Sequence, residues 1–491
     1  MKLARNTLLN LIGLGAPLAV ALFTIPVLIQ QLGTARFGLL TLIWAVVSYF
    51  SLFDLGLGRA LTQRLASTLA RGAEREVGAV VATALVLMGG ISLVAAALMA
   101  TLAPWAVSKV SGIPDTAEAV RAMWIMAATV PAVVMATGLR GILEAQHAFF
   151  WVNLIRLPLG IYTFLAPLAV ALWWGPQLDA IALSLAAGRL LALAAQAALA
   201  WRCLPTDRGP VQWHEAQVRP LLTTGGWLTL GSLVGPIMGY ADRFILAAAV
   251  SASAVAFYVT PQEIVTKLWI VPGALTAVLF PAFAAAAVNG GGEGWKMAQL
   301  GIRWLFVVLV PITLALTLFA NPLLSVWVGA TFAAESAPVL KWFALGILIN
   351  CMAHVPLTLL QGAGQARAPA VLQAMQLVPY LALLWWATTH WGVVGAAITW
   401  CARMVFDTAA MFALAARSHR PQGPRQFRPG SMLAVAAVSM AFGVGMVMDS
   451  ISLNAGIGLG LGLWLSVSLA VAWLLKPWAQ PSAATVRTVA A

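Results

Sequence analysis

The chain has 491 residues, of which 62% are hydrophobic and only 9% charged, and its formal net charge is +13. A soluble protein of this length needs far more polar surface than this composition can supply. Apolar runs recur from Leu8 to Leu475, and nothing between them is long enough to form a soluble domain. Because about 20 apolar residues cross the hydrocarbon layer as a helix, the sequence predicts an all-α, polytopic membrane protein.

About fourteen membrane spans are predicted, with no loop longer than about 20 residues between them. The longest loops are expected at 58–76, 202–220 and 417–430. In chain order the spans are 8–30, 37–57, 77–103, 121–143, 152–174, 180–201, 221–249, 258–288, 301–320, 338–360, 369–389, 393–416, 431–449 and 455–475.

The basic residues are distributed unevenly over the two sides of these spans. If the N-terminus is cytoplasmic, nineteen Lys and Arg residues fall on the inside and only Arg36, Lys109, Arg121 and Lys341 on the outside. This asymmetry follows the positive-inside rule and predicts cytoplasmic N- and C-termini. The net charge therefore reflects topology, and no nucleic-acid partner is expected. The first apolar run is too long for a signal peptide and is interpreted as an uncleaved helix.

Motifs for catalysis are not found in the sequence. Cys203, Cys351 and Cys401 have neither metal spacing nor a disulfide framework. No Walker loop, HExxH motif or nucleophile triad occurs, so we expect no catalytic residues, no metal and no cofactor. A membrane glycosyltransferase or polymerase would carry a large extramembrane loop. The expected protein is therefore not an enzyme.

The second half of the chain resembles the first at a nearly constant offset in residue number. Trp173-Trp174 precedes Gly188-Arg189, and Trp385-Trp386 precedes Ala402-Arg403. We predict two pseudosymmetric six-helix lobes, residues 1–219 and 220–417, followed by two extra helices and a tail in 418–491. In transporters built from such repeats, the substrate site lies near the midplane between the halves.

Charged residues inside the spans are expected to have a structural or functional role, because inserting each one at the membrane centre costs about 2.5–3.5 kcal/mol. Some fall four residues apart and can pair along a helix, as Glu263 and Lys267 do in the favourable order. We interpret one group as charge pairs or gating residues: Asp54, Asp242, Glu263, Asp407, Arg140 and Glu144. A second group is predicted to line a cationic, substrate-binding cavity: Arg189, Arg403, Arg59, Arg243, Lys267 and Arg156.

Arg189 is the strongest of these candidates, because no acidic residue lies within one helical turn of it. Arg403 is its apparent mate in the repeat. The planar guanidinium donates two parallel hydrogen bonds and suits a diphosphate. The alternative is structural: Arg189 could pair across helices with Asp54 or Glu144, and Arg156 could extend its charged end to the interface.

Two stretches of the sequence resemble a known family. The run Phe50-Ser51-Leu52-Phe53-Asp54-Leu55-Gly56-Leu57-Gly58-Arg59 resembles the span-two signature of the polysaccharide-transport flippases. Asp242-Arg243-Phe244-Ile245-Leu246 and Leu279-Phe280-Pro281 are further similarities. That family belongs to the multidrug/oligosaccharidyl-lipid/polysaccharide exporter (MOP) superfamily, whose members have twelve or fourteen helices in two lobes.

The resemblance implies a flippase that carries an undecaprenyl-diphosphate-linked oligosaccharide, such as an O-antigen or exopolysaccharide unit, across the bacterial inner membrane by alternating access. It also implies a lipid-linked oligosaccharide as substrate, with a polymerase and other polysaccharide-assembly proteins as candidate partners. The sequence lacks an arginine inside span one, so the arginine pattern of lipid II flippases cannot be transferred by position. A cation-coupled multidrug or toxin exporter and a lipid II flippase remain alternatives.

Overall fold

The computed structural model describes residues 2–50, 56–146, 148–288, 292–365, 367–418, 429–447 and 453–475, and these are almost entirely helical. Ten helical stretches in this part of the chain are long and apolar enough to cross a membrane. The prediction of an all-α, polytopic membrane protein is confirmed. The chain forms two compact units, residues 1–256 and 257–491.

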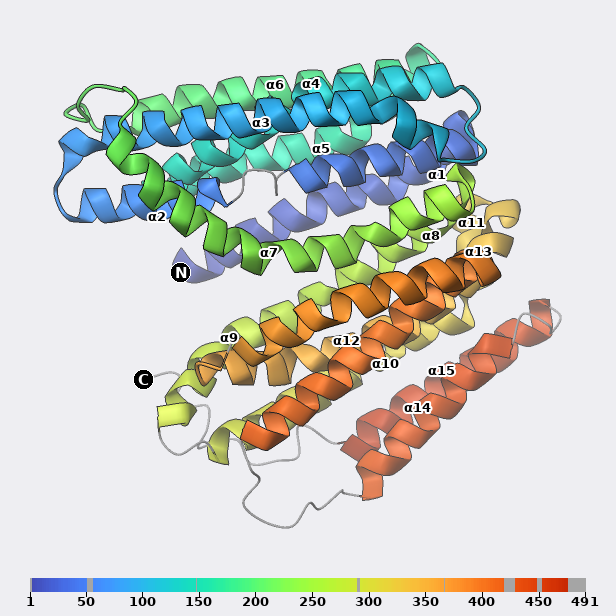
Figure 1. Ribbon diagram of the computed structural model, residues 1–491. Coiled ribbons are helices and arrows are strands. Elements are labelled where there is room, and N and C mark those ends of the chain that lie inside the picture. The colour runs from blue at the N-terminus through green and yellow to red at the C-terminus, as the bar shows by residue number, and fades with distance from the viewer. Residues whose placement is uncertain are drawn as a thin grey trace. The chain divides into compact units, whose positions relative to one another are not determined.

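The first unit is built mainly from α1 to α7 (Figure 1). Its main bundle is α3 (Val77–Ser108), α4 (Thr116–Ala145) and α6 (Leu178–Cys203), and α4 packs on both of the others. Around it lie α1 (Lys2–Phe50), α2 (Leu57–Ala70), α5 (Phe149–Trp173) and α7 (Glu215–Ala249). Helix α8 (Ala252–Thr266) begins in this unit and continues into the next.

The second unit is centred on α12 (Ala330–Gly362), which packs against α13 (Arg367–Ser418) and α10 (Gly292–Leu318). Helices α9 (Ile270–Val288) and α11 (Ala320–Val328) pack on α12 as well. The last two helices, α14 (Pro429–Val447) and α15 (Leu453–Leu475), pack on each other and on α10.

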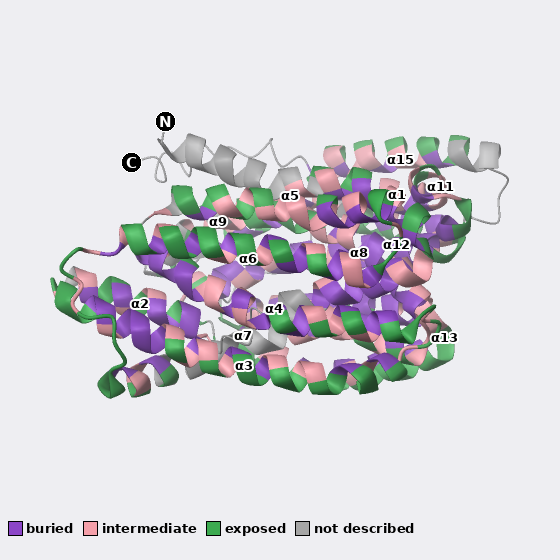
Figure 2. Cartoon of the chain, turned by 90° about the horizontal axis from the view of Figure 1, so that it is seen from above, coloured by how far each residue is buried: buried purple, intermediate pink, exposed green. Residues whose placement is uncertain are grey.

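Exposed residues run along α3 and α6 in Figure 2. Many of them are large and apolar, including Leu93 and Leu98 on α3 and Leu183 and Leu191 on α6. An apolar face of this kind suits lipid rather than water. The interior of the unit is apolar too, so the buried polar groups stand out.

Helix α2 differs from the sequence prediction, which placed a loop at 58–76. Leu57, Leu61 and Leu65 recur at helical spacing and are fully buried, and α2 packs on α3, α4 and α7. Arg59 and Gln63 occupy the opposite, exposed face. The polar residues of that face lower the mean hydropathy, which is why a search for apolar runs missed this amphipathic helix.

Two very long helices are each interrupted by one glycine. At 1.5 Å per residue, the 49 residues of α1 would extend about 74 Å, more than twice the thickness of the hydrocarbon core. Gly33 (φ 74°, ψ 164°) breaks α1, and Gly392 (φ 57°, ψ −137°) breaks α13. Each break falls between two predicted spans, and each helix is long enough for two crossings.

Left-handed glycines recur at one fixed separation along the chain. Gly112 precedes α4 and Gly329 precedes α12. The number of residues between these two glycines is the same as that between Gly175, before α6, and Gly392, inside α13. The ends of α4 at Ala145 and α12 at Gly362 keep the same separation. These backbone features agree with an internal repeat and give it a register, in which Gly175 corresponds to Gly392.

Replacing Gly392 by alanine is expected to destabilise the protein by about 1–3 kcal/mol, because φ is positive there and other residue types adopt it only with strain. No atom of the described residues lies within 4 Å of the added methyl group, so the cost is conformational rather than steric. Thermal unfolding of the detergent-purified protein measures the change. Gly90→Ala, on helical backbone with equal space around it, is the control and should leave the melting temperature unchanged or raised. Equal melting temperatures for the two variants would contradict the prediction.

Candidate functional site

Arg189 lies on the side of α6 that packs into the first unit. Ala182, Leu185 and Gln196, which share its helical face, are buried, and α6 packs on α4 and α5. The Arg189 Nε atom is buried and has no hydrogen-bond partner among the described residues. Glu144, one of its two possible structural partners, instead forms an ion pair with Arg140 (Nε to Oε1 3.7 Å). The other, Asp54, lies outside the described residues.

Tyr162 of α5 packs beside this position. Its hydroxyl donates to the Ser184 carbonyl oxygen (3.0 Å), and its ring covers Gly188 so closely that a Cβ there would overlap the ring. Glycine at 188 therefore permits α5 and α6 to approach closely next to Arg189. Gln196 Oε1, two turns further along the same face of α6, is likewise buried without a partner in the part of the chain that the structure describes.

Arg403 lies in the second unit, on the second half of α13. Its guanidinium lies over the ring of Tyr380, 5.0 Å from the ring centroid, in a cation–π arrangement. Asp407, one turn later, accepts a hydrogen bond from Gln376 Nε2 (3.3 Å). Tyr380 and Gln376 both belong to the first half of α13, so the turn at Gly392 brings these partners back to the arginine and the carboxylate.

The separation of the paired glycines can be compared with that of Arg189 and Arg403, the predicted mates of the repeat. More residues separate Arg189 from Gly175 than separate Arg403 from Gly392. At the separation of the paired glycines, the position that corresponds to Arg189 is Phe406. The difference between positions 403 and 406 corresponds to about 4.5 Å of rise and about 60° of rotation away from alignment. In a repeat of this register the two cations would not be symmetry mates.

Asp242 and Arg243 are adjacent and both buried on α7, the aspartate completely. The Arg243 backbone N–H donates to Asp242 Oδ1 (2.8 Å), and the guanidinium lies 4.8 Å from the ring centroid of Tyr240. Arg243 and Arg403 thus each lie over a tyrosine ring, a contact that the sequence pattern did not indicate.

The remaining candidates are more accessible. Lys267 and Glu263 form an ion pair along α8 and the following turn (Nζ to Oε2 2.9 Å), with both side chains partly exposed. Arg59 on α2 and Arg156 on α5 are exposed. Surface ion pairs of this kind contribute at most about 1 kcal/mol to stability.

Sequence reasoning missed a buried charge cluster at the start of α4 and α6. Glu118 is almost fully buried; its Oε2 accepts from Arg36 Nε (3.3 Å) and Nη2 (3.2 Å), and its Oε1 accepts from the Leu178 backbone N–H that begins α6. Beside it, Arg121 pairs with Asp179 (3.1 Å). The Glu118 contacts join distant parts of the chain and hold α1, α4 and α6 together at one end.

The matching family model covers residues 3–287, more than half of the chain, and describes a polysaccharide biosynthesis protein. The chain belongs to the polysaccharide biosynthesis protein family. The polysaccharide-related family predicted from the sequence is confirmed; its place among the transporters of the MOP superfamily stays a prediction.

Individual relatives agree with this assignment. This chain is 26% identical over 409 residues to the Shigella flexneri protein named "Putative O-antigen transporter". The similarity covers 83% of this chain and 96% of that protein. Its fold is similar to the lipid II flippase MurJ in an inward closed conformation (TM-score 0.75, 10% identity, 96% of this chain and 100% of that one). It is also similar to an inward-facing multidrug resistance MATE transporter of the MOP superfamily (TM-score 0.70, 13% identity, 83% and 97%). At these identities, the structural likeness shows the fold alone.

Proposed function

We propose that this protein is a flippase for an oligosaccharide linked to undecaprenyl diphosphate, such as an O-antigen or exopolysaccharide unit, in the bacterial inner membrane. Family membership and the O-antigen transporter relative support the class of substrate. The observation that carries the proposal is Arg189, a cation on the inward face of a membrane-spanning helix whose Nε has no partner in the described ranges. An arginine in such a place is costly unless an anion binds it.

A diphosphate suits this position chemically. It carries negative charge over several oxygens, and the guanidinium fork can donate two parallel hydrogen bonds to them. In a site of low dielectric these contacts are stronger than in water. The proposed cycle binds the diphosphate in one conformation of the protein and releases it in another, since a ligand drives a transition only by binding the two states differently. The sugars cross in the polar interior while the lipid tail stays in the bilayer.

The proposal predicts that Arg189→Ala will weaken substrate binding by about 10- to 100-fold, the equivalent of losing a charge-assisted hydrogen bond of about 1.5–3 kcal/mol. Arg189→Lys keeps the charge but loses the fork, and we expect an intermediate result. The measurement is the distribution of lipid-linked oligosaccharide between the two leaflets in cells that lack the protein and carry each variant. Arg121→Ala is the matched control, because that guanidinium is exposed and already paired with Asp179.

The outcomes separate the candidate functions. Build-up on the cytoplasmic face, relieved by wild type and Arg121→Ala but not by the Arg189→Ala/Arg403→Ala double variant, supports both the flippase and its arginines. Relief by the double variant as well keeps the flippase and removes the arginines from the site. If loss of the protein instead stops peptidoglycan synthesis, it is a lipid II flippase. If no lipid-linked intermediate accumulates, the cation-coupled exporter becomes the better explanation.

A further inference from the structure

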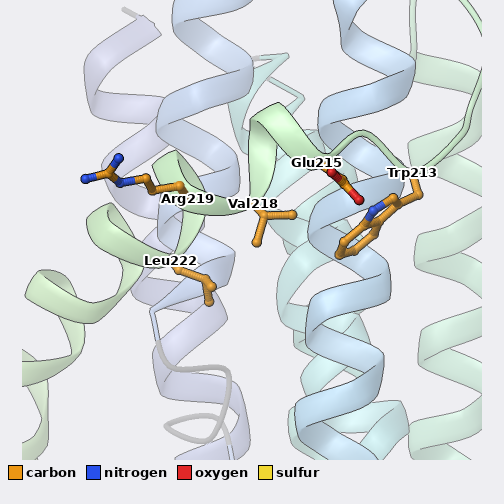
Figure 3. A pocket seen from close by; sticks show the side chains of 5 residues that line it. All are labelled: Trp213, Glu215, Val218, Arg219 and Leu222. Carbon is orange, nitrogen blue, oxygen red and sulfur yellow. The ribbon is translucent and has the colours of Figure 1, made fainter.

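A pocket of about 500 Å³ opens where α7 begins, lined by Trp213, Glu215, Val218, Arg219 and Leu222 (Figure 3). Glu215 points toward the Trp213 ring and Arg219 extends in the opposite direction, so the two charges do not converge on one ligand. Two buried polar groups that do share one helix face lie instead on α6.

These two groups are the side chains of Arg189 and Gln196. Gln196 is only 9% exposed, and its Oε1 atom is buried without a hydrogen-bond partner among the described residues, as is the Nε atom of Arg189. In an α-helix the two positions are offset by about 10.5 Å of rise and about 20° of rotation, so both side chains leave α6 on the same face. This face therefore carries a buried donor and, two turns later, a buried acceptor.

The two atoms have opposite hydrogen-bonding requirements. A buried acceptor without a donor is unfavourable, because it has lost its water and gained no other partner. In a membrane-spanning helix no lipid chain can replace that water. The oxygens of a diphosphate diester are acceptors only, so they satisfy Arg189 and leave Gln196 Oε1 without a donor. A ligand that satisfies both atoms must carry an anion at one end and a hydrogen-bond donor at the other.

We propose that Gln196 binds the sugar attached directly to the diphosphate, by accepting a hydrogen bond from a ring hydroxyl or from an acetamido N–H. This inference rests on the proposed function, in which Arg189 binds the diphosphate. A diphosphate together with its first sugar ring is comparable in length with the offset between the two residues along α6. The sugar then lies on the side of Arg189 toward the end of α6 at Cys203. Gln196 thereby distinguishes a glycosylated lipid from the bare lipid diphosphate.

Access to this site requires a change in the packing of α6. Both atoms are buried in the described conformation, in which α6 packs on α4 and α5 and the Tyr162 ring of α5 covers Gly188 beside Arg189. The ligand therefore reaches them in a conformation in which α6 separates from a neighbouring helix. The closed conformation leaves both groups unsatisfied and the open, ligand-bound one satisfies them, which is the difference in affinity that a ligand-driven transition needs.

The test measures the binding of three lipids to the full-length, detergent-purified protein by microscale thermophoresis: undecaprenyl diphosphate, and the same lipid carrying glucose or N-acetylglucosamine. We expect wild type to bind at least one sugar-bearing lipid about 2- to 10-fold more tightly than the bare diphosphate, the effect of one hydrogen bond. Gln196→Leu should remove this preference and leave the binding of the bare lipid unchanged. Arg189→Ala should weaken the binding of all three. Preference for both sugars identifies a hydroxyl as the donor, and preference for N-acetylglucosamine alone identifies the acetamido N–H.

Gln63→Leu, at an exposed position of α2, is the matched control and should retain the preference for the sugar. The melting temperature of each variant is measured in parallel. Gln196→Leu should melt at or above the wild-type temperature, because it removes a buried acceptor that has no partner in the described ranges. If it melts early, Gln196→Met decides the outcome, since methionine keeps the length of the side chain without its polar atoms.

The results separate this inference from the proposed function. Equal binding of all three lipids by wild type would overturn the sugar contact and leave the flippase and Arg189 in place. A Gln196→Leu variant that keeps the preference, or that weakens all three lipids in equal proportion, would overturn it as well. If wild type binds none of the three lipids, the proposed flippase function fails and the sugar contact fails with it.

Discussion

Replacing Glu118 by alanine is expected to destabilise the protein by about 3 kcal/mol. The substitution leaves Arg36 without this counter-ion and the first N–H of α6 without this acceptor. Breaking a buried pair by removing one partner costs about 3–5 kcal/mol. The lower value applies here because the Arg36 side chain keeps 28% of its surface exposed and water replaces part of the interaction. Glu118→Gln keeps an acceptor for the N–H and should lose about half as much.

Thermal unfolding in detergent measures this effect, and Glu263→Gln provides the comparison. Glu263 also pairs with a cation, but its side chain is 38% exposed, so its removal should change stability by less than about 1 kcal/mol. A double-mutant cycle with Arg36→Gln isolates the coupling between the two charges. If Glu118→Ala and Glu263→Gln lower the melting temperature equally, the cluster at the start of α6 does not stabilise the unit.

Gly38→Val should cause a comparable loss, of at least the ~1–3 kcal/mol typical of overpacking. A Cβ atom at this position would overlap the Ala252 carbonyl oxygen, which is backbone and cannot rotate away. The start of α8 would have to move. It would then lose the hydrogen bond from Ala252 N–H to the Ser111 carbonyl oxygen (2.9 Å) and the contact between Thr34 and Ser253 (3.3 Å).

Gly38→Ala should already show most of this effect, because the clash begins at the first carbon of the side chain. Gly239→Ala on α7 is the control, since no described atom lies within 4 Å of its added methyl group. The melting temperatures of the three variants give the result directly. Similar values for Gly38→Ala and Gly239→Ala would show that α1 and α8 do not meet as closely as the structure places them.

Much of the fold could be predicted from the sequence, because a helix that crosses a membrane needs an apolar run of a characteristic length. Each predicted span overlaps a described helix, and α1 and α13 are interrupted at Gly33 and Gly392, between predicted spans. Charge pairs four residues apart could also be predicted, because the pairs Arg140 with Glu144 and Glu263 with Lys267 follow from helical periodicity alone. Local periodicity carries no information on tertiary partners, however.

The rest depended on contacts between distant parts of the chain. Arg36 was noted only for its side of the membrane, and its partner Glu118 lies 82 residues away. The tyrosines beside Arg243 and Arg403 could not be predicted as their contacts, because an aromatic residue in an apolar span usually serves only to pack against neighbouring helices. Helix α2 was missed because its exposed polar residues reduce hydropathy although its leucine face is buried. A single averaged index cannot separate the two faces of such a helix.

The constant separation between paired left-handed glycines has an evolutionary consequence. It is the length expected of a unit copied within one gene, and it is visible where backbone conformation favours glycine over every other residue. Side-chain chemistry has no such restriction, and the separation of the two arginines differs from it by nearly one helical turn. Distant homologues of this chain are therefore better aligned on their turns than on their charges.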